Sequence, residues 1–185
     1  MDINTVYMIV VVVLVIVAVG VILGVVYSQR KQRSQKLQEH FGPEYEHTVQ
    51  TTGDEKKAQN ELVERQKHVD ALDIRPLTAP EHDHYLAAWA AVQSKFVDEP
   101  GQAIIDADQL IIEVMQLRAY PVSDFDQRAA DISVNYPALV SNYRAAREIA
   151  NKNKLQQAST EELRQAMIYY RSLFEELLAT EAVAV

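Results

Sequence analysis

The chain has 185 residues and a formal net charge of −8 at pH 7, with 18 Lys and Arg against 26 Asp and Glu. It contains no cysteine, which excludes disulfide bonds, thiolate catalysis and cysteine-ligated zinc. The part after residue 37 is more acidic than the whole, because four of the basic residues lie within 28–37. Such a surface repels a phosphate backbone, so we expect no nucleic-acid partner.

A run of 22 residues without charge, 6–27, follows a short N-terminal tail, 1–5. At a rise of about 1.5 Å per residue it reaches about 33 Å as a helix, which is enough to cross a bilayer. The tail carries no Lys or Arg, and no small-residue cleavage pattern follows the run. The sequence therefore predicts an uncleaved transmembrane helix and a lipid bilayer as the first partner.

The basic residues beside this helix predict its orientation. Arg30, Lys31, Arg33 and Lys36 follow the run, and none precedes it. The positive-inside tendency then places the N-terminus outside the cell membrane and the following domain in the cytoplasm. The same four cations are suited to anionic lipid headgroups, at about 1 kcal/mol each. An outward-facing envelope component stays open as an alternative, since a chain without cysteine fits either compartment.

Two glycines in the predicted span, Gly20 and Gly24, have the spacing that lets membrane helices approach closely. This spacing allows a homodimer through the span. The alternative is that glycine is simply common in membrane helices.

Between the span and the compact domain we expect two regions. Residues 28–53 are a basic juxtamembrane helix and linker, in which Gly42 and Pro43 end the helix and Glu44–Gly53 form the linker. Residues 54–77 are a solvated helix and connector, because the apolar stripe of this helix is thin. That stripe consists of Ala58, Leu62, Val69 and Leu72.

Residues 78–179 predict a helical bundle, followed by a frayed tail at 180–185. Capping boxes at Thr78–Glu81 and Ser159–Glu162 begin its first and last helices. The helix over about 101–118 is apolar around most of its circumference and belongs at the centre. No convincing strand pattern occurs after the span. The predicted fold class is all-α, with one N-terminal transmembrane helix followed by a four- or five-helix bundle.

Several short motifs spread over residues 37–178 resemble a widespread group of uncharacterised bacterial proteins, which are single-span and membrane-anchored. The motifs are Phe41-Gly42-Pro43-Glu44-Tyr45, Ile74-Arg75-Pro76-Leu77, Phe96-Val97-Asp98, Asp124-Phe125, Leu163-Arg164-Gln165-Ala166-Met167 and Tyr170-Arg171-Ser172-Leu173-Phe174. The resemblance implies the anchored architecture and brings no activity with it. The group carries Gly where this chain has Ala119, so we expect no left-handed residue at this junction.

The spacing Glu-x-x-His, which carboxylate-bridged metal sites use in helical bundles, occurs twice. One pair is Glu44 and His47, in the predicted linker. The other is Glu81 and His84, in the first turn of a helix, where acids normally complement the helix dipole. Both positions are poor for a core site, so we expect no metal and no cofactor.

Asp108 lies off the polar stripe of the central helix, on a face with Ile104, Ile111 and Met115. It is either a perturbed acid in a pocket or, as we favour, a structural partner of an arginine on a neighbouring helix.

Arg164 and Arg171 are seven residues apart and share a face of the last helix. They could bind an anionic ligand or partner. The favoured alternative is a solvated flank.

Because no catalytic group is convincing, we expect a noncatalytic interaction or scaffold module that binds an unidentified protein partner at the membrane. An enzyme or metal- or cofactor-binding bundle is the alternative.

Overall fold

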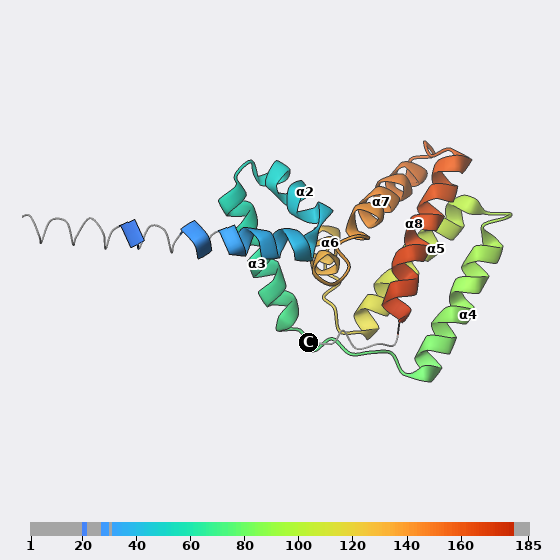
Figure 1. The fold of residues 1–185 in the computed structure, drawn as a ribbon. Helices are drawn as coiled ribbons and strands as arrows, with labels where there is room; N and C mark the ends of the chain where they lie inside the picture. Colours follow the sequence, from blue (N-terminus) through green and yellow to red (C-terminus); the bar gives the residue numbers. More distant parts are fainter. Residues whose placement is uncertain (1–19, 22–26, 30, 180–185) are drawn as a thin grey trace, which may run out of the picture. The chain divides into compact units, whose positions relative to one another are not determined.

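The computed structural model describes residues 20, 21, 27–29 and 31–179 (Figure 1). Contacts along the chain divide it into two units, 1–39 and 40–185. Most of the predicted span 6–27, with Gly24, as well as Arg30 and the tail 180–185, lies outside the described residues. Within them, no helix is both long and apolar enough to cross a bilayer. In the first part, residues 31–39 are helical, and Lys31, Arg33 and Lys36 are exposed.

The basic helix ends where the sequence predicts, at a turn around Gly42, whose φ is +48°. The sequence predicts a linker after this turn, but the segment is the helix α2, Pro43–Thr52. Proline at its first position and Gly53 in the left-handed conformation after its end give it clear boundaries. The prediction was wrong because this helix has no apolar stripe: two of its three buried residues are Glu44 and Thr48.

Helix α3, Glu55–Asp70, starts at Asp54, whose carboxylate accepts the N–H of Lys57 at 2.8 Å. Ala58, Leu62 and Val69 are buried, as the thin stripe indicates. The helix is more than a solvated connector, however, because it packs against both α2 and α6.

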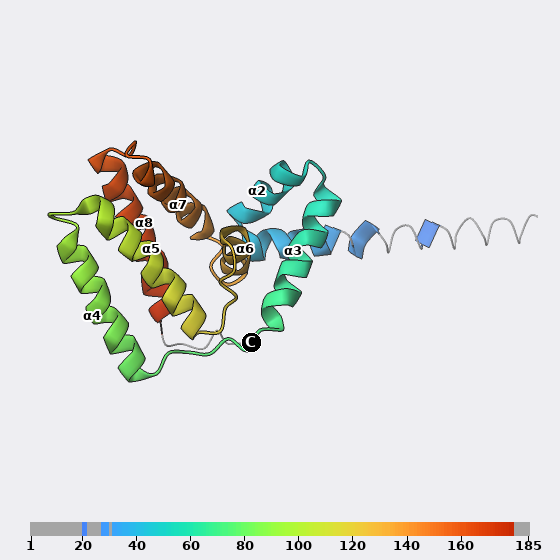
Figure 2. The same cartoon turned by 180° about the vertical axis from the view of Figure 1, so that it is seen from behind.

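The bundle consists of α4, Ala79–Lys95; α5, Pro100–Leu117; α6, Phe125–Asn135; α7, Val140–Lys154; and α8, Thr160–Leu178. Helix α5 contacts α4, α7 and α8, and α7 also packs against α6 and α8 (Figure 2). The apolar centre includes Ile104 and Ile111 of α5, both fully buried, and Trp89 stacks on Phe174 with ring centroids 4.6 Å apart. No strand occurs among the described residues, and the prediction of an all-α bundle is confirmed there.

The turn after α5 requires a left-handed residue, and Ala119 supplies it with a φ of +69°. The N–H of Tyr120 donates to the carbonyl of Met115 at 2.9 Å, and that of Ala119 to the carbonyl of Gln116 at 3.0 Å. These are the two bonds of a Schellman turn. The expectation that this junction needs no left-handed residue is therefore wrong, and a Cβ there costs about 1–2 kcal/mol.

We expect Ala119→Gly to raise the free energy of unfolding by about 0.5–1 kcal/mol, since relief of the left-handed strain exceeds the added chain entropy. Denaturation of the full chain in detergent micelles, followed by circular dichroism, measures the change. The matched control is Ala87→Gly on the exposed face of α4, which should lower stability by about 1 kcal/mol. A loss of stability in both variants would contradict the strain argument.

Candidate functional site

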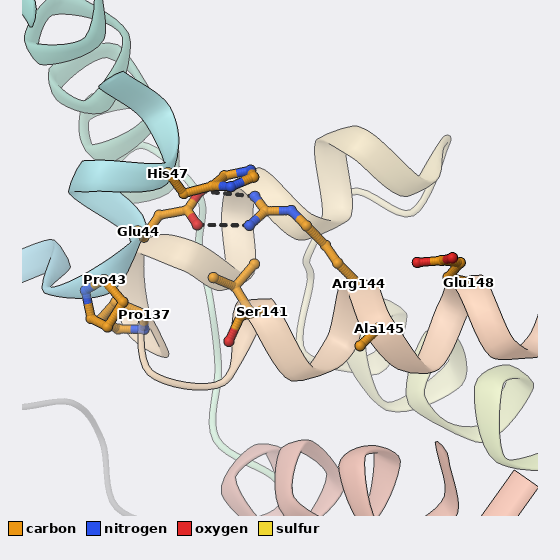
Figure 3. Close-up of a pocket in the computed structure, with 9 residues that line it drawn as sticks. Pro43, Glu44, His47, Pro137, Ser141, Arg144, Ala145 and Glu148 are labelled. Carbon is orange, nitrogen blue, oxygen red and sulfur yellow. Dashed lines mark hydrogen bonds and ion pairs between the residues drawn. The ribbon is translucent and has the colours of Figure 1, made fainter. Parts of the chain in front are cut away.

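One buried carboxylate, that of Glu44, connects three helices. The residue is 2% exposed, and both of its oxygens are held by arginines. Arg144 of α7 donates from Nη1 to Oε2 at 2.7 Å and from Nη2 to Oε1 at 2.8 Å (Figure 3). Arg65 of α3 donates from Nη1 to Oε1 at 2.8 Å and also bonds Glu61 at 2.5 Å. Glu44 therefore fastens α2 and α3 to α7 through its charge.

The two arginines keep Glu44 ionised. Burial by itself raises the pKa of this carboxyl, but the hydrogen bonds and charges of Arg144 and Arg65 outweigh burial and hold the pKa below its ordinary value. Because the folded-state pKa is depressed, the stability contributed by Glu44 is present above the unfolded-state pKa. It is lost as pH falls through the folded-state pKa.

A cavity of about 310 Å³ adjoins this carboxylate, between α2 and α7. Its apolar lining includes Pro43, Pro137 and Val140. Its polar lining includes His47, whose ring lies beside the Glu44–Arg144 pair (Figure 3), and Ser141. Among the described residues, neither the His47 ring nor the Ser141 hydroxyl has a hydrogen-bond partner. The cavity is large enough for a small ligand, but its arginine is already engaged.

A second, more open groove of about 470 Å³ lies between α3 and α6. Asp131 of α6 has a fully buried side chain and is in contact with two residues of its lining. Asp131 Oδ1 accepts a hydrogen bond from Gln127 Nε2 at 2.7 Å and is 3.6 Å from His68 Nε2. Within the described part of the chain, Oδ2 has no hydrogen-bond partner. Burial raises the pKa of Asp131, and Gln127 and His68 only partly oppose the shift.

The two Glu-x-x-His pairs do not assemble metal sites in the described structure. Glu44 is bonded to its arginines. Glu81 accepts hydrogen bonds from Nη2 and Nη1 of Arg75 at 2.8 and 2.9 Å. Glu81 also accepts the N–H of Thr78 at 2.8 Å, and the exposed His84 ring lies against Tyr85. No group of three or more metal-binding side chains converges anywhere in the described ranges.

Asp108 is buried, 8% exposed, and forms an ion pair with Arg147 of α7. Its other oxygen accepts the hydroxyl of Tyr170 of α8 at 3.0 Å, and burial, followed by the charge of Asp108, raises the pKa of Tyr170. Asp108 does not line the cavity between α2 and α7 or the groove between α3 and α6. The arrangement is that of a structural pair which joins α5, α7 and α8.

The two arginines proposed as an anionic-ligand surface are paired within their own helix. Arg164 bonds Glu161 at 2.6 Å, and Arg171 bonds Glu175 at 2.7 Å, all with exposed side chains. Each acid neutralises its arginine locally, and exposed pairs of this kind contribute little to stability.

Sequence reasoning missed the Glu44 cluster, Asp131 and Arg118. Arg118 is 3% exposed and donates to the Leu177 carbonyl at 2.9 Å and to the Tyr136 hydroxyl at 3.0 Å. A signal for Asp131 exists in its spacing, since it lies three residues after Arg128 and next to Ile132 on the buried face of α6. Glu44 gave no such signal, because its helix lacks an apolar face.

Comparison with protein-family models, curated proteins and solved structures finds no match to this chain.

We expect Glu44→Gln to lower the free energy of unfolding by about 2–3 kcal/mol, because it leaves two half-buried arginines without their shared counter-charge. Chemical denaturation of the full chain in micelles measures the loss. The matched control, Glu46→Gln, alters an exposed residue of the same helix and should change stability by less than about 0.5 kcal/mol. Equal effects of the two variants would show that the arginine contacts are unimportant.

We expect Asp131→Asn to raise stability at pH 7 by about 1 kcal/mol, because a buried carboxylate oxygen without a partner is costly. The folded-state pKa of Asp131 lies above the unfolded value of about 4, so ionisation disfavours folding as pH rises through it. The gain should therefore vanish below about pH 4. Denaturation at several pH values measures it, and a variant less stable than wild type at pH 7 would contradict the expectation.

Proposed function

We propose that the protein is a single-pass membrane protein whose helical body, residues 40–179, acts as a noncatalytic interaction module. The observation that carries the proposal is the uncharged run 6–27 followed directly by four basic residues. By the positive-inside tendency, the N-terminus lies outside and the body lies in the cytoplasm. Lys31 and Lys36, which are exposed, would then face anionic headgroups, and Arg33 is exposed on the same segment.

The two buried carboxylates that pair with arginines support a noncatalytic role. Glu44 and Asp108 both connect helices through arginines, so their charges are engaged in holding the fold. Catalytic acids generally combine a perturbed pKa with an accessible cleft and a second reactive group. In the described residues, Glu44 adjoins a cavity, but its two arginines occupy both of its oxygens.

Self-association through Gly20 and Gly24 is part of the proposal. Among the described residues, nothing lies within 4 Å of a Cβ added at Gly20, which leaves room there for a neighbouring helix. Close approach at glycines favours packing of membrane helices. A second copy is therefore one of the protein partners we expect.

A ligand-binding bundle is the second candidate, and the cavity between α2 and α7 is the observation that favours it. His47 and Ser141 offer polar groups there, next to an apolar lining. Elemental analysis of the purified full chain addresses metal binding: stoichiometric iron, manganese or zinc that is lost in His47→Ala or His84→Ala would favour this candidate over the interaction module.

We expect the full chain to remain in membranes through alkaline carbonate extraction, and Val13→Lys with Val17→Lys to release it. Each lysine at the centre of a span costs about 2.5–3.5 kcal/mol of insertion free energy. The matched control, Gln35→Lys with Gln38→Lys, adds the same charge in the basic flank and should stay in the membrane fraction. Release of the unmodified chain by carbonate would refute the anchor.

Crosslinking of intact membranes that contain the full chain tests the interaction role. We expect it to recover a protein partner or a second copy of the chain. Recovery of neither would contradict the proposed function while leaving the membrane anchor unaffected.

A further inference from the structure

The groove between α3 and α6 combines surface acids with a buried, incompletely bonded carboxylate. We propose that it binds a lysine or arginine side chain from a basic segment of a protein partner, with Asp131 as the buried counter-charge. The inference rests on the proposed interaction role and specifies which surface the partner uses and which chemistry it brings.

The charges that line the groove favour a cation. Four acids line it, and the basic lining consists of Arg65 and the titratable His68. Arg65 is already neutralised by Glu44 and Glu61. Of the four acids, Glu64 pairs with Lys67 at 2.8 Å, but both side chains are at least 66% exposed, so the pair is weak. Of the other acids, Glu61 pairs with Arg65, and Asp124 accepts the N–H of Gln127 at 2.8 Å. Within the described chain this leaves Asp126 as the lining acid without an ion pair or a hydrogen bond.

Asp131 supplies an observation independent of these surface acids. Its side chain is fully buried, and Oδ2 has no hydrogen-bond partner in the described chain. The two residues that contact Oδ1, Gln127 and His68, both line the groove, so Asp131 lies directly behind its wall. A buried carboxylate oxygen without a partner is unfavourable, and a positive charge brought into the groove would reduce that cost.

The form of the site suits a long basic side chain better than a metal ion. In the described residues, no three metal-binding groups converge, so the oxygen cage that a divalent cation needs is not assembled. A lysine or arginine needs fewer contacts: its aliphatic stem can pack on Ala130 while its charged end faces the acids. The His68 side chain is 45% exposed, so it can turn aside to admit the charge.

The test uses the full chain in nanodiscs of phosphatidylcholine, which has no net charge, and a short fluorescent lysine–glycine peptide as the probe. The same peptide with acetylated lysines is the uncharged control and should not bind. We expect Glu64→Gln with Asp126→Asn to weaken peptide binding by about fivefold. The matched control is Asp98→Asn with Glu176→Gln, which removes two exposed charges elsewhere and should change affinity by less than about twofold.

Asp131→Asn is the decisive variant. We expect it to weaken peptide binding by about tenfold, because it removes the buried counter-charge. Since the same substitution is expected to stabilise the fold, lost binding would not reflect unfolding, and a melting curve of each variant checks this. Unchanged affinity in Asp131→Asn, or equal losses in the groove and control pairs, would overturn the proposal. If a groove variant still crosslinks to the same protein partner in membranes, this inference is wrong but the interaction role stands. If the unmodified chain crosslinks to no partner at all, the interaction role itself is wrong.

Discussion

The fold of the body depends on one shared counter-charge. Glu44 is nearly inaccessible to solvent, and its two oxygens together accept three hydrogen bonds from Arg65 and Arg144. Removing a carboxylate from water is costly, and only charged partners with good geometry offset this cost. The bonded geometry thus favours a single way of docking α2 and α3 onto α7. The thin apolar stripe of α3 then adds burial against α6.

Glu44 and its partner Arg65 line two different surfaces of the body. Glu44 lines the cavity between α2 and α7, and its charge there is balanced by its two arginines. Arg65 lines the groove between α3 and α6. Asp131 contacts two residues of the groove's lining through Oδ1, and its Oδ2 has no hydrogen-bond partner in the described residues. A positive charge bound in the groove would lower the free-energy cost of this buried carboxylate. The carboxylate of Asp108 needs no such ligand, because Arg147 already neutralises its charge.

The parts of the fold that local patterns control could be predicted from the sequence. Glu81 and Glu162 accept the N–H groups of Thr78 and Ser159, both at 2.8 Å, so the capping boxes begin α4 and α8 as expected. Asp108 could be singled out because it interrupts an apolar face. Glu44 could not, because its partners are 21 and 100 residues away, and no periodicity encodes such a pair. The helix α2 was missed for a different reason: two of its three buried residues are polar, so it shows no apolar stripe.

We propose that residues 6–27 hold a helical interaction module at the cytoplasmic side of a membrane. Because the chain contains no cysteine, a single cysteine reports its own accessibility without background. Asn4→Cys and Glu176→Cys, each in the full chain, are exposed in turn to a membrane-impermeant maleimide in sealed right-side-out vesicles. We predict labelling of the first variant before lysis and of the second only after lysis. Labelling of Glu176→Cys in intact vesicles would contradict the account and place the body outside.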